Sequence, residues 1–130
     1  MKRNLKKLGV FLVVAMLCLT GIQCTNDVWA SRQRIEYDDG DIYNGNVNDA
    51  TGEKQGKGKY LCANGVIITG TWKNDYLTGQ GIVIYPNKDK YVGSFKMDKR
   101  NGSGTYRFRN GDVYRGKWKN DKMNGKGRYT

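Results

Sequence analysis

The chain has 130 residues, with 23 Lys and Arg against 12 Asp and Glu, 18 Gly, 9 Tyr, one Pro and no His. This length gives room for one domain with a modest core, and the glycine content favours short, closely spaced strands over a helical bundle. Because histidine is the commonest general base and a frequent metal ligand, its absence argues against catalysis and metal binding. We therefore expect no enzyme, no metal and no cofactor.

Residues 1–30 have the organisation of an export signal. A basic start precedes an apolar run over 8–20, and small residues at the end of the segment suit a signal peptidase. The run is shorter than the roughly 20 residues of a spanning helix. We predict a signal peptide cleaved before Ser31 and an exported protein that is periplasmic, secreted or envelope-associated. An uncleaved anchor, or a lipid attached at Cys24, stays open.

Residues 31–36 are expected to be a linker, followed by a repeat array over 37–130. Near its start, Asp38, Asp39 and Asp41 cluster around one turn. They could suggest a metal site or paired catalytic carboxylates, but they cluster around a single hairpin turn without the spacing of a calcium-binding loop. We interpret them as a solvated acidic edge.

A period of 23 residues runs through the array. Gly58, Gly81, Gly104 and Gly127 are spaced by this period, and aromatic residues recur in step with them. We predict that the glycines stand where rings or a neighbouring hairpin pack closely over the strand. The positions assigned to this packing are Gly45, Gly58, Gly70, Trp72, Gly81, Tyr91, Gly93, Phe95, Gly104, Tyr106, Tyr114, Gly116, Trp118 and Gly127.

Within each repeat the residues alternate as in a strand with two different faces. Tyr114, Gly116 and Trp118 fall on one face, and the basic residues between them fall on the other. Asn110-Gly111 predicts a tight hairpin turn between two such strands, so each repeat is predicted to be one β-hairpin. Each connection between hairpins holds one aspartate, which we expect to cap the backbone amides of its own turn. These aspartates are Asp75, Asp98 and Asp121.

Seven basic residues are predicted to share or flank the face opposite the rings. Such a surface attracts anionic lipid, acidic polysaccharide or an acidic protein, although solvated cations also keep a flat sheet soluble. Nucleic acid is not expected, because strand-stacking binders carry rings and cations on the same surface. The seven residues are Arg107, Arg109, Arg115, Lys117, Lys119, Lys126 and Arg128.

The recurring pattern Tyr-x-Gly-x-Trp/Phe, followed by Gly-x-Gly-x-Tyr, resembles the MORN repeat (membrane occupation and recognition nexus). It is carried by Tyr43-x-Gly45, Tyr91-Val92-Gly93-Ser94-Phe95 and Tyr114-Arg115-Gly116-Lys117-Trp118. The resemblance implies an all-β fold, an elongated single-layer array of antiparallel β-hairpins. It also implies a scaffold or protein-binding role, often near membranes and sometimes as an appendage of an enzyme.

These observations predict an exported, non-catalytic binding or scaffold module for a protein partner or an envelope surface. The alternative is an accessory module that targets an enzyme system to anionic lipid or polysaccharide. Because the sequence stops at Tyr129-Thr130, inside a predicted strand, we expect about four hairpin units with the last one incomplete. That open edge is expected to pair with a second chain in a homo-oligomer, to fray, or to mark the chain as a fragment.

Overall fold

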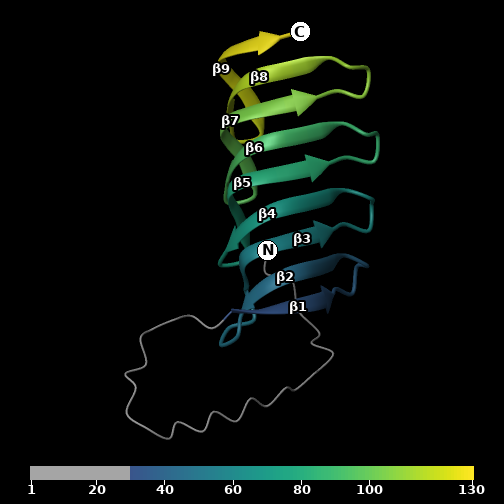
Figure 1. The fold of residues 1–130 in the computed structure, drawn as a ribbon, viewed down its shortest axis with the longest axis vertical. Coiled ribbons are helices and arrows are strands. Elements are labelled where there is room, and N and C mark those ends of the chain that lie inside the picture. Colours follow the sequence, from purple (N-terminus) through teal and green to yellow (C-terminus); the bar gives the residue numbers. More distant parts are fainter. Residues whose placement is uncertain (1–29) are drawn as a thin grey trace, which may run out of the picture.

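The computed structural model describes residues 30–130, which form one open sheet of nine antiparallel strands stacked in chain order (Figure 1). This arrangement confirms the predicted all-β array of hairpins. Within the described residues no helix is long and apolar enough to cross a bilayer. The strands are β1 (Ala30–Glu36), β2 (Ile42–Asn48), β3 (Lys54–Leu61), β4 (Ile67–Lys73), β5 (Tyr76–Ile84), β6 (Lys90–Lys96), β7 (Lys99–Arg107), β8 (Val113–Lys119) and β9 (Lys122–Tyr129).

The array begins earlier than the sequence predicts. Residues 31–36, expected to be a linker, lie in β1 and pair with β2 in a continuous register from Ala30 to Glu36. The strand lacks the repeat glycines and rings, but Ile35 packs against the core, which explains why the segment is ordered. The predicted export signal lies, apart from Ala30, outside the described residues.

One glycine from each of the strands β2–β9 pairs directly with a glycine of the next strand. We call this row the glycine ladder, and it runs across the full width of the repeat array. A chain of such pairs leaves a continuous strip on one face of the sheet without side chains. Its members are Gly45, Gly58, Gly70, Gly81, Gly93, Gly104, Gly116 and Gly127.

Tyrosine rings lie on this strip, as the predicted close packing requires. A Cβ atom on Gly104 would stand 2.3 Å from the Tyr91 hydroxyl oxygen, which is closer than atoms in contact approach one another. The Tyr91 hydroxyl then donates to the Ser94 carbonyl at 3.1 Å. The register of β6 on β7 shifts next to this carbonyl, so the ring both covers the ladder and satisfies a backbone acceptor beside a bulge. Tyr43 and Tyr114 repeat the arrangement.

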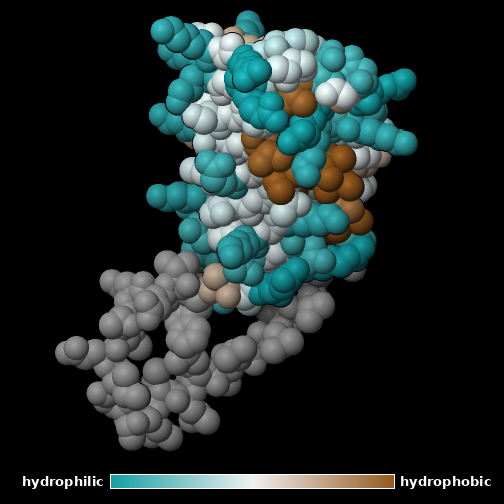
Figure 2. Space-filling view, turned by 45° about the horizontal axis from the view of Figure 1, so that its top comes forward, coloured by the Kyte–Doolittle hydropathy of each residue, from teal (hydrophilic) through white to brown (hydrophobic). Residues whose placement is uncertain are grey.

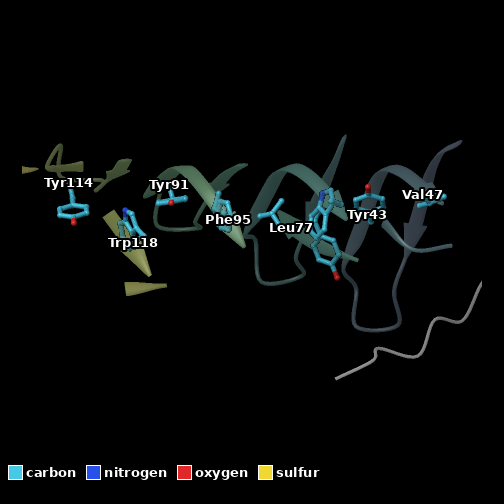
Figure 3. Close-up of a cluster of buried hydrophobic side chains, with 10 residues drawn as sticks. Tyr43, Val47, Leu77, Tyr91, Phe95, Tyr114 and Trp118 are labelled. Atoms are coloured by element: carbon cyan, nitrogen blue, oxygen red, sulfur yellow. The ribbon is translucent and has the colours of Figure 1, made fainter. Parts of the chain in front are cut away.

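The side chains around the ladder form a single elongated core, seen as a line of residues along the array in Figure 3. We call the side of the sheet that carries them the ring face, and the opposite side the outer face. Tyr91 has no exposed surface and meets Phe95 and Trp118 edge-on, each at 5.2 Å between ring centroids. In the second repeat Ile68 replaces the tyrosine, and Leu77 covers Gly70 in its place.

The turns differ from the prediction. Of the predicted tight turn at Asn110-Gly111, only Gly111 has a positive φ, and its N–H donates to the Phe108 carbonyl at 3.0 Å. This is a longer turn that ends in a left-handed glycine. The two-residue turns with positive φ at both positions are instead the connections between repeats, such as Asn74-Asp75 and Met97-Asp98. Successive strands are therefore all joined by hairpins.

The expectation that Asp75, Asp98 and Asp121 cap their own turns is wrong. Each carboxylate accepts a hydrogen bond from a backbone N–H in the preceding repeat, about one period earlier in the chain. Asp98 Oδ1, for example, accepts from the Leu77 N–H at 2.6 Å, and the Asp98 N–H donates to the Leu77 carbonyl at 3.0 Å. The equivalent bonds of Asp75 and Asp121 to their N–H donors are both 2.8 Å. These aspartates join neighbouring repeats at the ends of the strands where the two-residue turns lie.

A second line of aspartates joins the turns at the opposite ends of the strands. Asp89 is buried, and its carboxylate accepts from the Tyr106 hydroxyl and from the Arg109 N–H, both at 2.8 Å. Asp41 makes the same two bonds, to Tyr60 and Ala63. With 7% of its surface exposed, Asp41 is not part of a solvated acidic edge, and that interpretation is wrong for this residue. The repeat geometry places it where a carboxylate has two fixed donors.

In the second repeat all three residues that would make this hydrogen-bonded join are replaced. Val66 stands at the position of the aspartate, Val83 at that of the tyrosine, and Pro86 at that of the residue that donates its N–H. Val83 is buried and Val66 packs against the same core. Because proline has no N–H and valine has no acceptor, the polar join is replaced by an apolar one with no polar group left unpaired.

Candidate functional site

The ring face is filled by its own side chains over β2–β8, whereas Met123 and Tyr129 of β9 stay exposed on it. Ten hydrophobic residues along it are at most 7% exposed, and they include every ring that covers the glycine ladder. These buried rings are therefore engaged in folding and are not available to a partner.

Two cations lie among these rings, which corrects the prediction that alternation keeps rings and cations on opposite faces. The Arg100 guanidinium lies 4.3 Å from the Trp118 ring centroid and bonds Asp121 through Nε at 3.2 Å. Lys54 Nζ lies 5.1 Å from the Trp72 ring centroid and 3.5 Å from Asp75 Oδ1. Their side chains are only 19% and 13% exposed. Both are held by stacking and by a carboxylate, so neither is offered to a ligand.

The outer face carries the available charge. No Asp or Glu lies in β2–β9, whereas all of these strands except β2 and β5 contain Lys or Arg. After β1 the acidic residues are confined to the turns. Six of those turn aspartates accept hydrogen bonds. Five belong to the two lines that join neighbouring repeats, and Asp112 accepts from the Tyr129 hydroxyl. The strands therefore present a surface on which positive charge is not neutralised locally.

The structure exposes all seven predicted basic residues but does not bring all of them together. Arg109 lies in the turn after β7, where its N–H is bound by Asp89, and Lys119 lies at the end of β8. The other five lie on β7, β8 and β9, and we call them the basic cluster: Arg107, Arg115, Lys117, Lys126 and Arg128. Cross-strand pairing sets Arg115 against Arg128 and Arg107 against Lys90.

A shallow, open depression lies in the outer face within this cluster. Its floor includes backbone of the glycine ladder at Gly93, Gly104 and Gly116, where no outward side chain fills the space. Arg115, Lys117 and Lys126 line it together with hydroxyl and amide groups. Lys117 Nζ donates a hydrogen bond to Ser103 Oγ at 2.8 Å. The polar lining is completed by Gln80 and Thr105.

The titratable groups serve the fold. Burial raises the pKa of Tyr43 and of Tyr91 to about 12, so both stay protonated and keep donating to their carbonyls. The hydrogen bond from the Arg109 N–H, aided by the Tyr106 hydroxyl, holds the pKa of Asp89 below its usual value. Residues 30–130 contain no group of three His, Cys, Asp or Glu side chains that could hold a metal ion.

Sequence reasoning missed an aliphatic area on the outer face. Cross-strand pairs bring together Ile67 with Ile84 and Ile82 with Val92, and Ile84 and Val92 are each 39% exposed. Figure 2 shows hydrophobic side chains gathered in one patch among hydrophilic ones. The signal was present in β5, where Ile82, Val83 and Ile84 leave both faces apolar, but period-two reasoning assigned each strand one polar face.

Comparison with known proteins bears on this fold. The MORN repeat matches the chain at residues 52–67, 69–90, 91–113 and 114–130, which together make up more than half of it. The hairpin β1–β2 precedes these matches, yet Gly45 continues the glycine ladder into it. No curated protein matches the chain. On the repeats that it carries and the ladder that they build, the chain belongs to the MORN repeat family.

Proposed function

We propose that this chain is an exported, non-catalytic module that attaches to an anionic surface through the outer face of its sheet and serves there as a scaffold. Members of the MORN repeat family are generally non-catalytic modules that bind proteins or membranes. The segment that supports export, residues 1–30, has a basic start and a short apolar run.

The observation that carries the proposal is the distribution of charge. The strands β2–β9 hold no acidic residue, and the basic cluster is exposed on the outer face. A solvated surface that only kept the sheet soluble would gain more from interspersed charges of both signs. A face whose strands β2–β9 carry basic and no acidic residues is instead suited to anionic headgroups or an acidic polymer, to which each nearby Lys or Arg adds attraction.

The experiment is sedimentation of the protein with vesicles of phosphatidylglycerol and phosphatidylcholine, and separately with alginate, at low and at high salt. We expect binding at low salt that weakens at high salt, because exposed charges are screened. Arg115→Glu/Lys117→Glu should weaken low-salt binding roughly 30-fold or more, since each basic residue near the surface contributes about 1 kcal/mol.

The matched control is Lys73→Glu/Lys96→Glu, which makes the same change in net charge at exposed strand ends beside the two-residue turns. It should weaken binding much less than Arg115→Glu/Lys117→Glu, because Lys73 and Lys96 lie at the turn ends of β4 and β6 and outside the basic cluster. Equal losses in the two variants would mean that net charge alone governs attachment. Absence of binding to vesicles and alginate at any salt would refute the proposal and favour a protein partner.

A further inference from the structure

Six basic side chains form a diagonal band across the outer face of the last four strands. The cross-strand pair of Lys90 and Arg107 lies on β6 and β7, and the pair of Arg115 and Arg128 lies beside it on β8 and β9. Lys117 extends the band along β8, two residues after Arg115. Strands lie about 4.8 Å apart and residues about 3.3 Å apart along a strand, so the band is roughly 20 Å long. We call it the basic band: Lys90, Arg107, Arg115, Arg128, Lys117 and Lys126.

The charge of the basic band is not neutralised within residues 30–130. Five of its members are exposed and Lys90 is half-buried, and none of the six makes an ion pair with a carboxylate of these residues. Asp112, in the turn before β8, accepts instead from the Tyr129 hydroxyl at 2.9 Å. A negatively charged chain that lies along the band therefore meets cations without displacing an internal carboxylate. The ion pairs between described residues lie elsewhere, at Arg34–Glu36, Lys54–Asp75 and Arg100–Asp121.

The depression in the outer face lies against the band and offers three kinds of group. It has a volume of about 490 Å³, and three cations of the band line it. Val92, which is 39% exposed, adds an aliphatic side chain to the lining. Hydroxyl and amide groups come from Ser103, Thr105 and Gln80. A ligand that matches the whole lining combines negative charge, hydrogen-bonding groups and an apolar surface.

We propose that the partner of the outer face is an acidic polysaccharide, which lies along the basic band with one of its sugar rings in the depression. This inference rests on the proposed attachment to an anionic surface and names that surface. The ring of an acidic sugar carries a carboxylate for the cations, hydroxyl groups for Ser103 and Thr105, and a C–H face for Val92. The carboxylates of the neighbouring sugars lie along the rest of the band.

An anionic bilayer matches this arrangement less well. A planar surface meets the outer face as a whole, and on β1 that face carries the exposed carboxylate of Glu36, next to Ile42 of β2. Headgroup phosphates also need only the cations, which leaves the hydroxyl groups of the depression and Val92 without a role. A polymer crosses the band alone and uses every group of the depression.

Nucleic acid and an acidic protein segment also match the face poorly. Single-stranded nucleic acid is held by bases that stack on exposed rings, whereas the rings that cover the glycine ladder are buried on the opposite face. An extended protein segment gains most of its affinity from the free backbone groups of a strand edge. The backbones of β7 and β8 are already paired on both sides, so an acidic peptide would gain attraction from charge alone.

The first test removes hydroxyl groups and keeps every charge. Ser103→Ala/Thr105→Val should weaken the binding of fluorescently labelled alginate oligosaccharides, followed by anisotropy, about tenfold, because each lost hydrogen bond contributes modestly. Binding of polyglutamate, a polyanion without sugar hydroxyls, should not weaken. The matched control is Thr71→Ala/Thr69→Val, which makes similar changes at exposed outer-face positions of β4, outside the depression. Urea unfolding of each variant checks that the fold is intact.

The second test asks whether the band itself guides the polymer. Lys90→Gln/Arg107→Gln removes two charges at the end of the band furthest from the depression, and it should weaken alginate binding about fivefold. The matched control is Lys57→Gln/Lys59→Gln, which removes two exposed charges of β3 outside the band and should have less than about a twofold effect. Alginate with its carboxyl groups reduced to alcohols should not bind the parent.

The outcomes keep the two proposals apart. If Ser103→Ala/Thr105→Val binds alginate as tightly as the parent, or if the parent binds polyglutamate or phosphatidylglycerol vesicles as tightly as alginate, the polysaccharide proposal is overturned. A loss of binding in Arg115→Glu/Lys117→Glu would then still support an anionic surface. Equal losses in the band variant and in Lys57→Gln/Lys59→Gln would overturn the placement of the polymer along the band. If none of the charged probes is bound at low salt, both proposals fail.

Discussion

A single methyl group on the glycine ladder tests the account of the fold. In Gly104→Ala the new Cβ would stand 2.3 Å from the Tyr91 hydroxyl oxygen and 2.5 Å from its Cε2 atom. The ring has no free direction, since it is fully buried against Phe95 and Trp118. Overpacking of this kind costs about 1–3 kcal/mol, and moving the ring leaves the Ser94 carbonyl without its hydroxyl donor for about 1–3 kcal/mol more.

Part of that loss is offset because alanine restricts the unfolded chain more than glycine does, by about 0.4–1 kcal/mol. We expect a net loss of about 3 kcal/mol in the free energy of unfolding. Urea unfolding followed by circular dichroism measures it, and the midpoint should fall by at least about 1 M.

The ladder contains its own control. Gly70→Ala places a Cβ 2.7 Å from the flexible end of Leu77 and 3.0 Å and 3.1 Å from the Gln80 carbonyl oxygen and the Gly81 Cα atom. No tyrosine ring lies over this position, because Ile68 replaces it. Its cost should be smaller by about 1–2 kcal/mol. In a Tyr91→Leu background the ring that meets the new methyl group is gone, so Gly104→Ala should cost much less than in the parent. An equal cost in both backgrounds would refute the packing account.

Three further predictions concern charge and protonation. Asp89 has a lowered pKa in the folded chain, so its ionised form stabilises the fold above the unfolded pKa of about 3.9, and this contribution disappears as the pH falls through the folded pKa. In urea unfolding at several pH values, Asp89→Asn should therefore lose less stability than the parent between about pH 5 and pH 2. Tyr43 and Tyr91 have pKa values raised to about 12, so their contribution to the free energy of unfolding should be kept below about pH 10 and lost between about pH 10 and pH 12. Absorbance titration of Tyr91→Phe should show one late-ionising tyrosine fewer than the parent. Arg100→Leu introduces the residue that the previous repeat has at the equivalent position, Leu77. The free energy of unfolding should therefore change by less than about 1.5 kcal/mol, and vesicle binding should not change. A large loss of binding would show that Arg100 serves a ligand.

The strand faces could be read from the sequence because the repeat supplies several independent signals. Glycine and tyrosine at fixed offsets predict that rings cover a strip without side chains, and Tyr91 over Gly93 and Gly104 confirms it. Alternation also placed Arg107, Arg115 and Lys117 correctly on exposed strand positions.

The cross-strand register could not be read in the same way. Alternation says which face a residue occupies but not which residue of the next strand stands beside it, so the union of Ile67, Ile82, Ile84 and Val92 was not foreseen. The bulges near the ladder also shift the register, and strict alternation therefore failed for Lys54 and Arg100, which follow a turn and join the rings.

Other errors came from treating each repeat as if it stood alone. The turn pattern predicts that Asp98 caps its own turn, but its carboxylate accepts from the Leu77 N–H of the previous repeat. Aligning the repeats against one another would have found the joint change at Val66, Val83 and Pro86, because three partners of one hydrogen-bonded group change together. Positions that change together between repeats therefore indicate residues that are in contact across repeats.

That joint change makes the array respond to temperature unevenly along its length. At Asp41 and Asp89 the turns of neighbouring hairpins are joined by directional hydrogen bonds, but at Val66 and Val83 they are joined by apolar contact alone. Apolar association weakens on cooling, unlike the bonds to the two carboxylates. Cold should therefore loosen the contact of Val66 with Val83 before the polar joins on either side of it, while the backbone pairing of β4 with β5 persists.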